Sequence, residues 1–201
     1  EKDVNIIDIN SGCTGFVDAL EIANGFKEKT LIVCSENYSK HMKKFNRSVS
    51  TLFSDAASVF VYDKKVFQIK KYISGIKKDS YNDLFCNMNS SLEMKGANVY
   101  NFTTSEVIPA LKIFLKKINL NISKLYIHQA SNLVVTHFSN SFSSIEMPTN
   151  IKKIGNTVSS TIPILLHNDL KNNKIKKNSN LLLCSFGVGL GFNIMLIKYN
   201  G

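Results

Sequence analysis

The sequence predicts an α/β protein in which short strands alternate with amphipathic helices. Two observations lead to this prediction. Short runs rich in Val, Ile and Leu recur along the chain, and the segments between them place apolar residues at helical spacing. No linker rich in Pro, Gly or Ser interrupts the 201 residues, of which 44% are hydrophobic. We therefore expect one compact body with a substantial core.

The first part of the chain is predicted to contain four strands and one helix. The strands are expected at residues 3–10, 30–35, 57–62 and 66–73, and the helix from Thr14 onward. The run 30–35 is apolar throughout, which is typical of a strand buried on both faces. Asp63-Lys64, between the last two strands, indicates a hairpin. Residues 74–90 are the best candidate for a boundary between two parts of the body.

The rest of the chain is predicted to contain three helices and three strands. The helices are expected at residues 98–118, 131–142 and 157–170, and the strands at residues 125–127, 180–186 and 190–199. Pro109 predicts a kink in the first of these helices, because proline donates no hydrogen bond. The last two strands are apolar enough to lie centrally in a sheet, and Gly187-Val188-Gly189 joins them.

Composition narrows the classes of partner and site. The formal charge is +10, with lysines concentrated in residues 40–44, 112–117 and 171–177. These clusters lack interleaved aromatic stacking platforms and a recognised nucleic-acid-binding motif, so we interpret them as solvated faces and expect no nucleic acid partner. No apolar run approaches the roughly 20 residues that cross a bilayer, and the N-terminus shows no secretory signal, so we expect a cytoplasmic protein without a membrane partner. The four cysteines are irregularly spaced, which predicts neither a metal site nor disulfides.

Three residues stand where chemistry is expected. Cys13 lies between a predicted strand and a predicted helix, where free N–H groups and the helix dipole favour a thiolate, although a buried inert cysteine is equally compatible. His128 ends a strand, at the sheet edge where active sites gather, but it could also be a core histidine. Asn156 follows a glycine and precedes a helix, so it could simply be an N-cap. The Gly187–Gly189 turn could present N–H groups to an oxyanion or be a plain hairpin turn.

Six segments carry a resemblance to a known family. They are Asp8–Phe16 around Cys13, Leu52–Ala57, Met94–Tyr100, Ile127–Ala130 around His128, Gly155–Thr157 around Asn156, and Ser185–Gly189. In this order they resemble the β-ketoacyl-acyl-carrier-protein synthase III family of the thiolase superfamily. The likeness is imperfect at three positions, because Ser54, Ala56 and Val188 stand where the family usually has glycine.

The resemblance implies a thiolase-like layered α/β/α/β/α fold that is incomplete at its N-terminus. It implies that residues 1–80 are the remainder of an N-terminal half carrying the nucleophile, and that residues 81–201 form a C-terminal half carrying the histidine and asparagine. The likeness starts just before the nucleophile, so we expect a missing N-terminal segment, which could be a separate chain. It also implies a homodimer.

The resemblance also implies an enzyme of fatty acid biosynthesis and a role for each site residue in its reaction. Cys13 would be the nucleophile, His128 and Asn156 the condensation pair, and the N–H groups of Cys13 and Val188 the oxyanion hole. The remaining substrate contacts would come from Gln129, Phe186, Gly187 and Gly189. The substrates would be acyl-CoA and a malonyl thioester of an acidic acyl carrier protein, with no cofactor and no metal.

One departure concerns the carrier protein. The family has an arginine shortly after its His-Gln-Ala motif, where this chain has Leu133, Val134 and Val135. Lys124, Lys152 and Lys153 are the alternative candidates for contacting an acidic carrier, which would give the positive charge a function.

Three other functions remain open at this point. Relatives with the same Cys, His and Asn transfer acyl groups to oxygen or nitrogen without condensation. A cysteine peptidase shares the residue types, but it would not need the Gly187–Gly189 turn. A truncated, non-catalytic subunit or scaffold is the third alternative.

Overall fold

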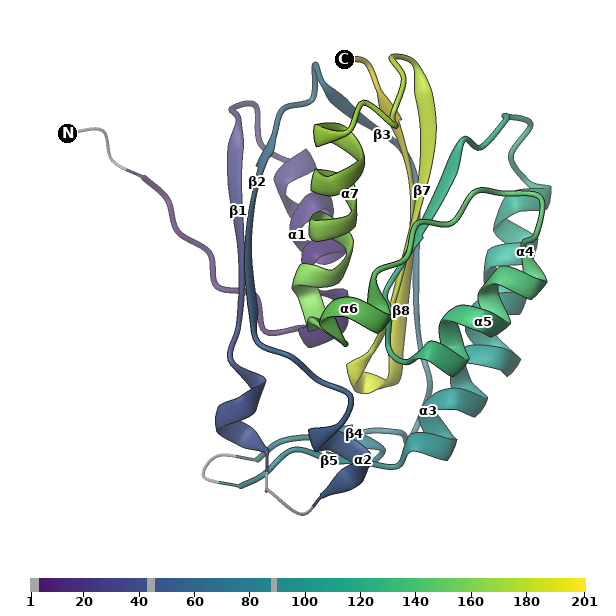
Figure 1. The fold of residues 1–201 in the computed structure, drawn as a ribbon. Coiled ribbons are helices and arrows are strands. Elements are labelled where there is room, and N and C mark those ends of the chain that lie inside the picture. Colours follow the sequence, from purple (N-terminus) through teal and green to yellow (C-terminus); the bar gives the residue numbers. More distant parts are fainter. Residues whose placement is uncertain (1–3, 43–45, 88–89) are drawn as a thin grey trace.

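Helices and sheets alternate through the protein in four layers. The computed structural model describes residues 4–42, 46–87 and 90–201. Asp3 of the predicted first strand, and Lys43 and Lys44 of the first lysine cluster, therefore lie outside the described residues. Figure 1 shows helices α1 and α7 side by side between a two-stranded and a four-stranded sheet, with α3, α4 and α5 on the far side of the larger sheet. The order of layers is therefore β/α/β/α.

The elements agree closely with the predicted alternation. The longer helices are α1 (Gly15–Asn24), α3 (Gly96–Phe102), α4 (Ile108–Lys116), α5 (Asn132–Ser141) and α7 (Thr161–Lys171), and the four-residue helices are α2 (Arg47–Ser50) and α6 (Ile151–Ile154). The strands are β1 (Thr30–Glu36), β2 (Ala56–Tyr62), β3 (Phe67–Ile76), β4 (Leu84–Phe85), β5 (Glu93–Met94), β6 (Lys124–Ile127), β7 (Ser179–Gly187) and β8 (Gly191–Tyr199). Among the described residues, no helix is long and apolar enough to span a membrane.

The larger sheet positions the C-terminal site residues. Its strand order is β3-β8-β7-β6, so β7 and β8 lie centrally, as their apolar sequences predicted. Strand β6 runs parallel to β7 and pairs Ile127 with Cys184. The chain leaves β6 at His128, whose N–H donates to the Cys184 carbonyl at 2.8 Å. The end of β6 and the end of β7 consequently meet at one edge of the sheet.

Two hydrophobic cores cover the two faces of this sheet. One contains Phe16 and Leu20 of α1, Leu165 of α7 and Ile32 of β1, and it lies between the two sheets. The other contains residues of α3, α4 and α5 and includes Cys13. Each fully buried Leu, Ile or Phe contributes about 1.5–3 kcal/mol to the stability of the fold. The core between the two sheets packs α1 against β6 and β7.

The predicted N-terminal strand is not formed, and the smaller sheet is covered on one face only. Residues 4–11 are extended without strand pairing, because a strand requires a neighbouring strand and none lies beside them among the described residues. Strand β1 was predicted to be buried on both faces. Its outward side chains Leu31 and Val33 are instead 62% and 60% exposed, beside equally exposed Val59 and Val61 of β2. The outer helical layer of the predicted five-layer fold is absent from this face in the part of the chain described.

The predicted hairpin between β2 and β3 is wrong. Strand β2 pairs with β1, whereas β3 pairs with β8 from the far end of the chain. The turn at Asp63 does form, since the Val66 N–H donates to the Asp63 carbonyl at 2.9 Å. It directs the chain from the smaller sheet into the larger one, so a local turn signal led to an incorrect pairing.

The long helix predicted around Pro109 contains a π-helical segment, and the kink at Pro109 stays a prediction. Residues Thr103–Val107 form this segment between α3 and α4, and Pro109 lies in the first turn of α4. A π-turn is a recognised cause of helix bending. The Ser131 side chain caps α5 by accepting from the Val134 N–H at 3.3 Å.

Candidate active site

Cys13 is placed by a short turn ahead of α1. It lies in a 3₁₀ turn, Gly12–Thr14, and only 4% of its surface is exposed. The turn is fixed to the helix and to the large sheet by one carboxylate. Asp18 accepts from the Thr14 hydroxyl and from the Asn193 amide of β8, both at 2.7 Å. The sulfur is therefore held by the packing of α1 against the sheet.

The turn after β7 lies directly against this sulfur. The backbone N–H groups of Val188 and of Cys13 itself lower the pKa of the Cys13 thiol. Gly187 is in close contact with it, because a Cβ placed on Gly187 would stand 2.6 Å from the Cys13 Cβ and 2.7 Å from its Sγ. The two N–H groups predicted as an oxyanion hole therefore converge on the predicted nucleophile.

His128 reaches the site from the end of β6. Its ring is 1% exposed and packs edge-on against Phe186, with centroids 5.6 Å apart, and Phe186 in turn stacks on Phe138. The backbone of Val158 lies near the imidazole and raises its pKa. Its Nδ1 is buried and has no hydrogen-bond partner among the described residues. An unpaired buried nitrogen is costly unless a substrate satisfies it.

Asn156 is held in the turn that follows α6. Its Oδ1 accepts from the Val158 N–H at 2.9 Å, and its Nδ2 donates to the Ala130 carbonyl at 3.3 Å. Val158 has a φ of 51°, which is a strained conformation for a β-branched residue and costs about 1–3 kcal/mol. Asn156 hydrogen-bonds with this residue, and the backbone of Val158 also acts on the pKa of His128, so one strained turn lies beside both predicted partners of Cys13.

Burial controls the protonation of both titratable groups in the site. It raises the pKa of the Cys13 thiol from 9.0 to about 12, and the nearby Glu36 carboxylate raises it further, while the Val188 and Cys13 N–H groups lower it. The expectation that the helix end favours a thiolate is therefore wrong. Burial also lowers the pKa of His128 to about 4, against an opposing effect of the Val158 backbone. At neutral pH the site contains a thiol and a neutral imidazole.

Glu36 is a site residue that the sequence analysis did not identify. It ends β1, and its Oε1 accepts from the Ser159 N–H at 3.2 Å and from the Ser159 hydroxyl. Ser159 follows Val158 directly, so Glu36 anchors the turn that carries Asn156. The only sequence signal is an acidic residue at the end of an apolar strand, and such residues are common at strand ends.

The residues predicted to contact substrate have different surroundings. Phe186 and Gly187 line the sulfur and the imidazole, as described above. Gln129 is fully buried, and its amide is engaged with the loop at residues 148–150: it donates to the Pro148 carbonyl and accepts from Thr149 and from the Asn150 N–H. Its described contacts are those of a residue that fastens this loop.

The three lysines considered for carrier binding also differ. Lys152 and Lys153 are exposed on α6, just ahead of Asn156. Lys124 is only 3% exposed and forms ion pairs with Asp169, at 3.3 Å, and with Glu146. Lys124 is therefore a buried structural residue, and its proposed contact with a carrier is wrong.

The sequence is similar to a known family and to several of its curated members. Residues 7–76 match the family model described as 3-oxoacyl-[acyl-carrier-protein] synthase III, and residues 118–199 match the model of its C-terminal part. A β-ketoacyl-[acyl-carrier-protein] synthase III 2 from Staphylococcus epidermidis is 29% identical over 98% of this chain and 68% of its own length. A synthase III from Latilactobacillus sakei is 27% identical over 96% of this chain and 68% of its own. The chain spans about two thirds of these relatives.

Solved structures agree with the fold. The crystal structure of 3-oxoacyl-[acyl-carrier-protein] synthase III from Aquifex aeolicus superposes with a TM-score of 0.85 at 25% identity, covering 96% of this chain and 66% of that one. Another 3-oxoacyl-(acyl-carrier-protein) synthase III structure gives a TM-score of 0.84 at 24% identity, covering 96% and 68%. These likenesses confirm the predicted layered α/β fold.

Proposed function

This chain belongs to the 3-oxoacyl-[acyl-carrier-protein] synthase III family of condensing enzymes, and on that premise we propose that Cys13 accepts an acyl group which then condenses with a malonyl thioester. The observation that carries the proposal is the close approach of the Gly187–Val188 backbone to a buried thiol, whose pKa the N–H groups of Val188 and Cys13 lower. A structural cysteine has no need of such donors. An acyl-transfer nucleophile requires them.

The first half-reaction is attack of the Cys13 sulfur on the carbonyl carbon of an acyl-CoA thioester. The carbonyl π electrons move to oxygen, and the two N–H groups stabilise the oxyanion that forms next to the sulfur. The carbon–sulfur bond to CoA then breaks, and the proton of the Cys13 thiol leaves on the CoA thiol. The product is an acyl thioester on Cys13, and no cofactor or metal takes part.

The second half-reaction uses His128 and Asn156. A malonyl thioester loses carbon dioxide, and the electrons of the broken C–C bond form an enolate on the thioester. Neutral imidazole N–H and amide N–H groups stabilise the enolate oxygen, and burial keeps His128 neutral by lowering its pKa to about 4. The enolate carbon attacks the acyl group on Cys13, which regenerates the thiol after proton uptake and releases a β-ketoacyl thioester.

The second substrate is proposed to arrive on an acidic acyl carrier protein. The exposed Lys152 and Lys153 lie just ahead of Asn156, and the chain carries a formal charge of +10. Electrostatic attraction between such a surface and an acidic partner mainly raises the association rate. We expect the Lys152→Glu, Lys153→Glu double variant to need a higher carrier concentration for turnover while Cys13 acylation by acyl-CoA is unchanged.

The experiment that tests the function is acylation of Cys13. The protein is mixed with a short-chain acyl-CoA, and its intact mass is followed against a Cys13→Ala control. We expect a mass increase equal to the acyl group in the wild-type chain alone. An unmodified wild-type chain would contradict the proposal and favour a non-catalytic subunit.

The condensation step has its own readout. The acylated protein is supplied with a malonyl thioester, and carbon dioxide release is measured together with the β-ketoacyl product. We expect the two in equal amounts. Loss of the acyl group from Cys13 to an oxygen or nitrogen acceptor without carbon dioxide release would establish simple acyl transfer instead.

A further inference from the structure

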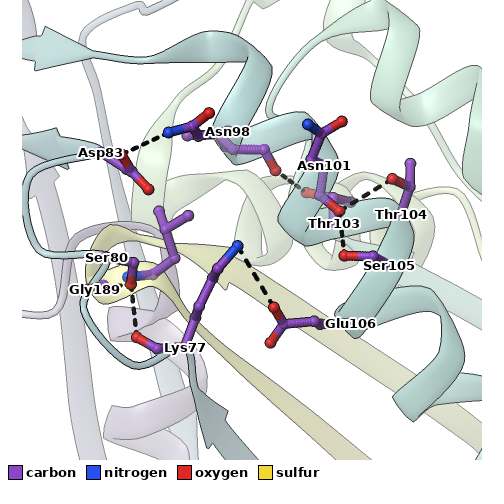
Figure 2. A network of polar contacts seen from close by, with 12 residues as sticks. Lys77, Ser80, Asp83, Asn98, Asn101, Thr103, Thr104, Ser105, Glu106 and Gly189 are labelled. Carbon is purple, nitrogen blue, oxygen red and sulfur yellow. Dashed lines mark hydrogen bonds and ion pairs between the residues drawn. The ribbon is translucent and has the colours of Figure 1, made fainter.

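Ser80 is a buried polar residue that the mechanism above does not use. It lies just after β3, is 3% exposed, and makes three hydrogen bonds with backbone groups. Its Oγ accepts from the Leu190 N–H at 2.7 Å and donates toward the carbonyls of Lys77, at 2.7 Å, and Gly189, at 3.0 Å. Figure 2 shows the serine beside Gly189 and Lys77. Two of these three contacts are to the turn that follows β7.

That turn is the one that supplies an N–H group to the Cys13 thiol. The Val188 N–H lowers the pKa of that thiol, and Gly189 and Leu190 follow Val188 directly. Gly189 has a φ of 129°, and a Cβ there would meet no atom within 4 Å. Gly189 has no side chain to hold it by packing, whereas Leu190 is buried in the core. The hydrogen bonds from Ser80 restrain the backbone of the turn at Gly189 and Leu190.

The segment around Ser80 is itself anchored to the helical layer. The Lys77 N–H donates to the Leu190 carbonyl at 2.8 Å, and the Lys77 ammonium lies 3.7 Å from the Glu106 carboxylate of the π-helical segment. Asp83, whose N–H donates to the Ser80 carbonyl at 3.0 Å, accepts from the Asn98 amide of α3 at 2.8 Å. Figure 2 shows both connections to the helix. Ser80 therefore joins a segment that is anchored to the helical layer to the turn that follows β7.

We propose that Ser80 is a positioning residue for the oxyanion hole, because its hydroxyl fixes Gly189 and Leu190 so that the Val188 N–H is aimed at the atoms reacting at Cys13. The proposal rests on the function proposed above. Replacing the hydroxyl by hydrogen leaves the Leu190 N–H buried without its acceptor, and the turn shifts to find another. Ser80 touches no reacting atom in this scheme.

Two reactions of the same sulfur separate a positioning role from a structural one. Acylation by an acyl thioester passes through an oxyanion and depends on the Val188 N–H. Alkylation by iodoacetamide displaces iodide from a saturated carbon, so no oxyanion forms, and the Val188 N–H acts only on the thiolate that both reactions require. A displaced turn therefore slows acylation more than alkylation, whereas a loosened core changes both rates alike.

The experiment compares Ser80→Ala, Ser80→Thr and Ser105→Ala with the wild-type chain. Ser105→Ala is the control. It removes another serine-to-backbone hydrogen bond, 2.7 Å to the Asn101 carbonyl, at an exposed position of the π-helical segment Thr103–Val107. Removing one oxyanion donor costs about 10²–10³ in rate. We expect Ser80→Ala, which acts at one remove, to slow acylation by roughly 10- to 100-fold, with alkylation within about twofold of wild type. Ser80→Thr, which keeps the hydroxyl, should restore acylation.

The possible results discriminate between the claims. Three results would overturn the positioning role. In the first, Ser80→Ala is acylated at the same rate as Ser105→Ala. In the second, the acylation and alkylation rates of Ser80→Ala fall in parallel, and in the third a folded Ser80→Thr is acylated as slowly as Ser80→Ala. A wild-type chain that is not acylated at all would instead overturn the proposed function, and this inference with it. Hydrogen exchange of the wild-type protein needs no variant. We expect strong protection of the Leu190 N–H, and exchange at the rate of an open loop would refute the contact with Ser80.

Discussion

Replacing Gly187 by alanine probes the closest contact in the site. The added methyl would stand 2.6 Å from the Cys13 Cβ and 2.7 Å from its Sγ. Ordinary contacts between such atoms are about 3.5–4.0 Å, so the sulfur and the turn must separate by about 1 Å. A misplacement of about 1 Å can cost 10²-fold in rate. We therefore expect Gly187→Ala to slow acylation of Cys13 by roughly 100-fold, with a loss of about 1–3 kcal/mol in unfolding free energy from overpacking.

The assay is the initial rate of mass increase on mixing with acyl-CoA, with urea unfolding measured on the same samples. Gly96→Ala is the matched control, because a Cβ there comes no closer than 3.9 Å to another atom, the Met94 Cε. It should acylate like the wild-type chain. A folded Gly187→Ala that also acylates at the wild-type rate would refute the close approach of this turn to the sulfur.

Three further predictions follow from charge and burial. Glu36→Gln should speed alkylation of Cys13 by iodoacetamide at pH 8, because the carboxylate raises the pKa of the thiol, and an unchanged or slower rate would count against this electrostatic contact. Lys124→Ala should lower the unfolding free energy by about 3–5 kcal/mol in urea titrations, because it removes the cation that pairs with the buried Asp169 carboxylate. Glu146→Gln, at a side chain 63% exposed, should cost under about 1 kcal/mol. Equal losses in the two variants would show that burial does not set the strength of these ion pairs. Acidification should destabilise the protein through His128, whose pKa is about 4 when folded and 6.5 when unfolded. The unfolded state takes up a proton in this window and the folded state does not, so about 3 kcal/mol of stability is lost as the pH falls from above 6.5 to below 4. His128→Gln should remove that component of the pH dependence, and an unchanged slope would contradict the assigned burial.

Sequence patterns predicted the second half of the chain better than the first. Strands β6, β7 and β8 and helices α5 and α7 appear where periodicity placed them, since each buries its apolar face within the described chain. Strand β1 was correctly located but not correctly buried, because half-burial or full burial depends on which layers surround a sheet. The predicted strand at residues 3–10 fails for the same reason.

The errors in pairing and in lysine function have a common physical origin. The turn at Asp63 predicts a reversal of the chain, yet β3 finds its partner in β8, about 130 residues away, and no local signal specifies that choice. Lys124 has the composition of a surface residue, and only the fold brings Asp169 of α7 beside it. Glu36 and Ser80 were missed because their contacts are to backbone groups of distant turns.

The helix end and burial act on the pKa of the Cys13 thiol in opposite directions, and their magnitudes decide which form of the thiol is present. A helix end stabilises a negative charge by about 0.3–1 kcal/mol, or up to about 2 kcal/mol where it is partly buried. The rise in the pKa of Cys13 from 9.0 to about 12 corresponds to about 4 kcal/mol against the thiolate, and burial is its main cause. Desolvation therefore outweighs the helix end and both N–H groups. In the proposed reaction the same two donors would act differently, because the charge then forms on a substrate oxygen and not on the sulfur, so the raised pKa of the thiol does not oppose their proposed role in an oxyanion hole.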